Sequence, residues 1–93
     1  MLQQACSIKP ENSVACNNLG LSLFEAKEFE EANEQFKRAI NYDNKNAIYY
    51  NNIALCYYHE NNNENAIKHF EQAIYLDPTE PKAYYNLGNT YLA

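Results

Sequence analysis

Cys56 and His59 lie three residues apart in the sequence. They carry a thiol and an imidazole, which together could support covalent chemistry. On a helix this spacing brings both side chains toward one face, where the imidazole could act as a base for the thiol. Nucleophilic catalysis would also need an orienting group and an oxyanion site, and the sequence indicates neither. We see no Gly-rich phosphate loop, paired catalytic carboxylates or zinc-ligand spacing, and His69 is better suited to cover a helix edge. We therefore expect no enzymatic activity, no cofactor and no metal site.

The three cysteines, Cys6, Cys16 and Cys56, have no metal-ligand spacing and suit small core positions. Their number is odd, and the first residues show no basic segment followed by an apolar stretch. We interpret them as reduced thiols and predict a cytoplasmic location. No apolar run approaches the roughly 18 residues of a membrane span, so we expect no membrane contact.

Composition limits the fold and the partners. Lys and Arg number 7 against 12 Asp and Glu, which gives the 93-residue chain a net charge of −5. That excess of acid argues against a nucleic-acid surface. Hydrophobic residues make up 46% of the chain, which is enough for a core, and 2 Gly and 3 Pro are too few for many tight turns. An all-α fold is therefore expected.

The elements that would position any site repeat along the chain with a period of 34 residues. Asn18, Asn52 and Asn86 fall in register, and so do Gly20 and Gly88. Each period contains two amphipathic stretches with helical spacing, such as residues 13–26 and 29–42. The stretches break at residues 26–28 and 61–63, where Asn tolerates the left-handed conformation that ends a helix. Because Gly has no side chain, we predict that each Gly leaves a notch in its helix, a gap into which a bulky side chain such as Phe36 of the neighbouring helix packs.

This pattern resembles the tetratricopeptide repeat (TPR) family, a 34-residue helix–turn–helix unit. The resemblance rests on Leu19-Gly20, Ala32, Phe36 and Ala39, on their counterparts one period later, and on the stretch 84–89. It implies a right-handed superhelical solenoid of about five helices. The expected divisions are the end of a preceding second helix at 1–12, full units at 13–46 and 47–80, and a first helix at 81–93. We further expect the chain to be a segment of a longer array, because neither end matches a complete hairpin.

TPR arrays are scaffolds for peptides or partner proteins, so the resemblance implies a groove lined by the first helix of each unit. An Asn amide can both donate to and accept from one peptide group, and Asn18, Asn52 and Asn86 could form a ladder along an extended backbone. The alternative is that these Asn residues simply face water. The residues predicted to line the groove are Asn17, Asn18, Leu21, Asn51, Asn52, Leu55, Tyr58, His59, Lys82, Tyr85, Asn86 and Asn89.

Two other functions follow from the same resemblance. The carboxylate clamp of co-chaperones resembles this chain only at Asn52 and Lys82, and without its other cations a carboxylate lacks most of its partners, so we disfavour it. The repeats could instead act as an assembly or spacer region that positions an enzymatic domain encoded elsewhere. In that case the apolar face of residues 81–93 could dock head-to-tail on residues 1–9 of another copy.

Overall fold

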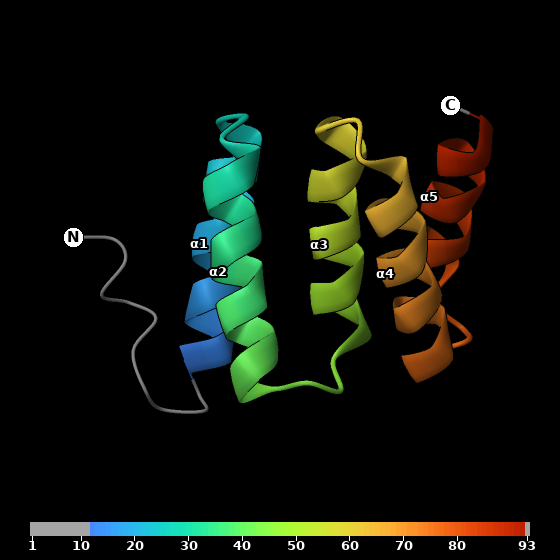
Figure 1. Cartoon of the computed structure of the whole chain (residues 1–93). Coiled ribbons are helices and arrows are strands. Elements are labelled where there is room, and N and C mark those ends of the chain that lie inside the picture. The colour runs from blue at the N-terminus through green and yellow to red at the C-terminus, as the bar shows by residue number, and fades with distance from the viewer. Residues whose placement is uncertain (1–11, 93) are drawn as a thin grey trace.

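The computed structural model describes residues 12–92, and this part of the chain contains five helices and no strand. Successive helices run in opposite directions and form an open array (Figure 1). The all-α prediction is thus confirmed for the described residues, whereas the half-helix expected at the start of the chain lies outside them. The helices are α1 (Asn12–Glu25), α2 (Phe29–Tyr42), α3 (Ala47–His59), α4 (Asn63–Leu76) and α5 (Pro81–Leu92).

The helices form two layers. Each helix packs against the next one along the chain, and in addition α1 contacts α3 and α3 contacts α5. Within residues 12–92, α2 and α4 do not contact each other. Because the odd-numbered helices lie closer together, the array curves toward them. We call the side formed by α1, α3 and α5 the concave face.

Helix ends repeat with the same period as the sequence. Lys27 and Asn61, which are 34 residues apart, have the positive φ angles of 65° and 64° that reverse the chain after α1 and α3. Asn46 Oδ1 accepts a hydrogen bond of 3.0 Å from the backbone N–H of Ile48 and so caps the start of α3. Asn62 caps α4 in the same way. The two predicted breaks are confirmed.

The core lies between the layers and consists largely of small residues around two phenylalanines. Phe36 and Phe70, one period apart, are fully buried. Phe36 fits against Gly20 so closely that a Cβ atom at Gly20 would lie 2.5 Å from the ring carbon Cε1. The predicted notch at Gly20 is therefore confirmed. At Gly88 the prediction is wrong for the described part of the chain, because a Cβ atom added there would have no neighbour within 4 Å.

The cysteines differ from one another. Cys56 is free and fully buried beside Ala32, Phe36 and Ile53. Cys16 is also buried, but it is disulfide-bonded, so the expectation of a reduced thiol is wrong at this position. Cys6 lies outside the described residues. The cytoplasmic location, which was inferred from reduced thiols, stays a prediction. Among the helices of residues 12–92, none is long and apolar enough to cross a membrane.

Candidate peptide-binding face

A buried amide bridge joins the first two helices of the concave face. Asn52 of α3 donates a hydrogen bond of 2.8 Å from Nδ2 to Oδ1 of Asn17 in α1. Each of the two side chains is 9% exposed. The bridge leaves Asn17 Nδ2 as a donor and Asn52 Oδ1 as an acceptor. Neither of these two atoms is a buried atom without a hydrogen-bond partner.

The same bridge recurs one repeat later. Asn86 of α5 donates from Nδ2 to Oδ1 of Asn51 in α3 over 3.3 Å. Asn51 is buried and Asn86 is half-buried. Since both partners are shifted by 34 residues from the first bridge, the spacing of the repeat places two amide pairs in a row along the concave face.

A third polar contact adds to the joint between α1 and α3. The hydroxyl groups of Ser13 and Tyr49 form a buried hydrogen bond of 3.2 Å. Neither residue was predicted to take part in a site. The contact shows that polar side chains hold adjacent first helices together, in addition to the apolar packing between the layers.

The structure does not line up Asn18, Asn52 and Asn86 as one equivalent set of free amides, as the predicted ladder required. Asn52 and Asn86 bond to Asn17 and Asn51 of the preceding helix, and Asn18 is exposed. The repeat period placed all five residues on one face but did not indicate that they pair between helices. The signal was present in the sequence, because Asn17 and Asn51 recur with the period just as their partners do.

The other predicted residues divide by their exposure. Leu21, Lys82 and Tyr85 are exposed, and Tyr85 keeps 71% of its surface accessible. Leu55 and Tyr58 are half-buried and pack against the cluster formed by Ala54, Ala66 and Phe70. Asn89 is half-buried near the end of α5.

His59 belongs to a group of aromatic rings. It stacks on Phe29, with ring centroids 5.0 Å apart and planes 8° apart. Its edges meet Phe24 at 5.2 Å and Tyr58 at 5.4 Å. These rings come from α1, α2 and α3, so His59 joins two hairpins by packing.

Cys56 does not form a nucleophile with His59. Burial, and to a smaller extent the nearby Glu60 carboxylate, raise the pKa of the Cys56 thiol from 9.0 to about 12. A thiol with that pKa is protonated at neutral pH, and catalysis by cysteine requires the thiolate. Cys56 and His59 instead serve packing: Cys56 lies in the core, and His59 stacks on Phe29.

The family follows from comparison with known proteins. A family model described as "TPR repeat" matches residues 20–59 and again residues 55–93. The chain belongs to the TPR family. Among curated proteins, no sequence matches it. The family and the solenoid fold predicted from the sequence are thereby confirmed.

Several solved TPR structures are similar to this TPR chain. The second TPR of Spaghetti (RPAP3), bound to the HSP90 peptide SRMEEVD, is 30% identical with a TM-score of 0.83, covering 86% of this chain and 74% of the other. The second TPR domain of human RPAP3, in complex with the HSP70 peptide SGPTIEEVD, is 30% identical with a TM-score of 0.82 and coverages of 87% and 68%. The Sgt2 TPR domain from Aspergillus fumigatus is 27% identical with a TM-score of 0.84 and coverages of 95% and 58%. Two of these three neighbours hold a peptide.

Proposed function

We propose that this TPR chain is a non-enzymatic scaffold that binds an extended segment of a partner protein along its concave face. The observation that carries the proposal is the row of two amide bridges, Asn17–Asn52 and Asn51–Asn86. Each bridge leaves the whole NH₂ group of one Asn and the oxygen of the other outside the bond. One peptide group of an extended ligand offers the matching oxygen and N–H.

The residues around the bridges favour contacts with an apolar or neutral ligand. Leu21 and Tyr85 are exposed large side chains on the first helices. They offer apolar area to the side chains of a peptide whose backbone is held by the amides. Binding through the backbone would allow several partner sequences, with selectivity coming from these flanking side chains.

An acidic chain terminus suits the face less well. Two neighbours were solved with peptides that end in EEVD, and carboxylates bind best to cations that also donate hydrogen bonds. At the positions that the clamp resemblance assigns, this chain has Asn17, Leu21, Asn52, Lys82 and Asn86, of which only Lys82 is charged. We therefore expect the peptide SRMEEVD to bind weakly and no better than the same peptide with an amidated C-terminus.

The test begins with selection of a random peptide library on the purified chain. The affinity of one selected peptide is then measured for wild type, Asn52→Ala and Asn86→Ala. We expect each variant to lose roughly twofold to tenfold in affinity, the value of one net hydrogen bond. Asn41→Ala changes an exposed Asn of α2 and serves as the matched control. Unchanged affinity in both concave-face variants would contradict the proposal.

Asn52→Ala also removes a bond within the protein, so its stability has to be measured in parallel. Loss of the bridge to Asn17 should lower the free energy of unfolding by about 1 kcal/mol. Urea unfolding of each variant shows whether enough folded protein is present in the titration. An affinity loss that persists when only the folded fraction is counted supports direct contact with the ligand.

A second function is favoured by the surface of α5. Tyr84, Tyr91 and Leu92 are exposed, the last two at 62% and 87%. Exposed apolar side chains gathered on one helix suit an assembly role in which copies associate head-to-tail. Sedimentation velocity at rising concentration measures this directly. If the wild-type chain stays monomeric at high concentration and sediments like the Tyr91→Lys variant, self-association through this helix is excluded.

A further inference from the structure

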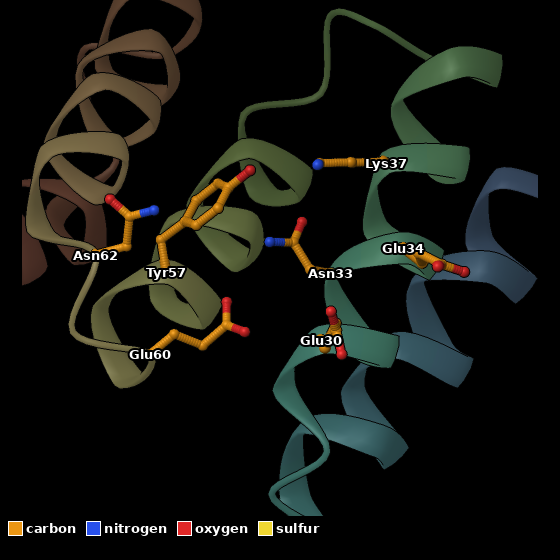
Figure 2. A pocket seen from close by; sticks show the side chains of 7 residues that line it. All are labelled: Glu30, Asn33, Glu34, Lys37, Tyr57, Glu60 and Asn62. Atoms are coloured by element: carbon orange, nitrogen blue, oxygen red, sulfur yellow. The ribbon is translucent and has the colours of Figure 1, made fainter.

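A hollow of about 520 Å³ lies between α2 and the end of α3, away from the predicted groove residues. Figure 2 shows side chains from both helices, and from the turn that leads into α4, pointing toward it. We call it the α2–α3 hollow. The side chains that matter for its chemistry are Glu30, Asn33, Glu34, Lys37, Tyr57 and Glu60.

Asn33 lacks a partner that its chemistry requires. The side chain is 6% exposed, and its Oδ1 atom is buried without any hydrogen-bond donor. In Figure 2 it extends from α2 into the hollow, toward Tyr57 on the facing helix. A buried acceptor without a donor has lost its hydrogen bonds to water without replacement, which destabilises the folded state. A ligand that donates a hydrogen bond at this point would recover that cost.

The rim of the hollow is acidic. Glu30 and Glu34 lie on α2 and Glu60 follows α3, and all three line the hollow. Just outside it, the pKa of the Glu31 carboxyl is raised, chiefly because of the neighbouring Glu28 carboxylate. Negative charges thus crowd this end of α2, and a cation placed here would reduce their mutual repulsion.

The hollow already accommodates one cation. The ammonium group of Lys37 lies over the Tyr57 ring, 5.7 Å from its centroid. Electron-rich aromatic faces attract cations in this way. Three carboxylates against one ammonium still leave a net charge of −2 in the lining. Within residues 12–92, no group of His, Cys, Asp and Glu side chains could hold a metal ion, and an organic cation with several N–H donors suits this lining better.

We propose that the α2–α3 hollow binds an arginine side chain of a partner protein. The guanidinium group donates one hydrogen bond to Asn33 Oδ1 and others to the carboxylates of Glu30 and Glu60. Its five N–H groups can serve an amide oxygen and two carboxylates together, whereas the compact lysine ammonium carries three donors on one atom. This contact site is separate from the concave face, so it can hold while the peptide proposal fails.

The experiment is an NMR titration of the full 93-residue chain with acetyl-Gly-Gly-Arg-Gly-Gly-amide. A peptide with citrulline in place of arginine has the same shape without the charge. We expect the arginine peptide to shift the Asn33 side-chain NH₂ signal and the Glu60 backbone signal in a saturable way at millimolar concentration. The citrulline peptide should leave both signals in place.

Variants separate this site from general attraction to an acidic protein. Glu60→Gln should weaken arginine binding by roughly twofold to fivefold, as expected for a partly exposed ion pair. Lys37→Met should strengthen it, because the competing ammonium is removed. Glu71→Gln removes an equal charge from an exposed position on α4 and should have little effect. Asn33→Leu should remove the response while circular dichroism confirms that the chain is folded.

Three results would overturn the proposal. The first is equal binding of the arginine and citrulline peptides. The second is a loss of affinity in Glu71→Gln that matches the loss in Glu60→Gln. The third is a set of shifted signals confined to the concave face. Each of these outcomes leaves the amide bridges, and the peptide selection that tests them, unaffected.

Discussion

Burial decides what individual side chains can do in this protein, and Cys56 is a clear case. Its thiol has no exposed surface and packs in the cluster that contains Phe36 and Ile53. Removing the thiolate from water is unfavourable, and this desolvation raises the pKa of Cys56 to about 12. The residue therefore acts as a small core side chain, and its ionisation is coupled to folding.

This coupling predicts how stability depends on pH. Below pH 9 the thiol is protonated in both states, and above that pH the unfolded chain loses the proton while the folded chain retains it. The contribution of Cys56 is therefore complete below about pH 9 and declines as the pH rises toward 12. Cys56→Ala should be about 1 kcal/mol less stable than wild type at pH 7, because it leaves a small cavity.

Urea unfolding of wild type and Cys56→Ala at several pH values between 7 and 11 measures this effect. All other residues are the same in the two proteins, so their effects cancel in the difference. We expect the stability advantage of wild type to fall as the pH rises above 9, and Cys56→Ala to become the more stable protein toward pH 11. A constant difference across this range would contradict the raised pKa.

At the residue scale the sequence identified the amide-rich face but not the contacts within it. The period placed Asn17, Asn51, Asn52 and Asn86 on the first helices, and a sequence pattern can go no further than a face. Which amide bonds to which depends on the distance and rotation between adjacent helices. Those are set by packing across the whole layer, for example by how closely α1 approaches α3.

Between elements, the fit of a side chain into a notch governs how closely two helices approach. Gly20 in α1 meets the ring of Phe36 in α2, and ring carbons would lie 2.5–2.9 Å from an added Cβ atom. Gly88 holds the equivalent position in α5, where an added Cβ atom would meet nothing within 4 Å. Replacing Gly by a larger residue should therefore have opposite effects on stability at these two equivalent positions.

Gly20→Ala and Gly88→Ala form a matched pair that tests this. Both substitutions improve helix propensity by about 1 kcal/mol. At Gly20 the methyl group would force the Phe36 ring to move, which typically costs about 1–3 kcal/mol. We expect Gly20→Ala to lower the midpoint of urea unfolding and Gly88→Ala to leave it unchanged or raise it. Shifts in the same direction, or a rise for Gly20→Ala, would show that Phe36 does not require the notch.

The elements themselves were predictable from the sequence because several local signals agree. Apolar spacing defined the helical stretches, and residues near Lys27 and Asn61 were predicted as breaks. The notch at Gly88 was predicted wrongly because identity of repeat position does not ensure identity of neighbours. The repeat period predicts what each unit tends to contact, but within the described residues no side chain from a following helix lies against Gly88.

At the scale of the whole molecule, stability in an array depends on how many neighbours each helix has. The third helix packs against α2 on one side and α4 on the other, and it also contacts α1 and α5. Seven of its residues are buried, including Ile53 and Cys56. The described part of α5 buries two residues, Ala83 and Thr90. Repeat proteins are stabilised by contacts between nearest neighbours, so unfolding of the 93-residue chain should begin at a helix with as few buried residues as α5.

Amide hydrogen exchange followed by NMR gives this gradient helix by helix. We expect protection factors in α5 to be at least about tenfold lower than in α3, a difference of about 1.4 kcal/mol in opening free energy. The Asn86–Asn51 bridge is the polar contact that ties α5 to α3. Asn86→Ala should therefore lower protection in α5 further, while Gly88→Ala should raise it and leave α3 unchanged. Equal protection in the two helices, unaffected by either substitution, would mean that the array unfolds as one cooperative unit. In that case α5 would be fixed in place for binding, whereas a fraying α5 gives the concave face one helix that a ligand has to order.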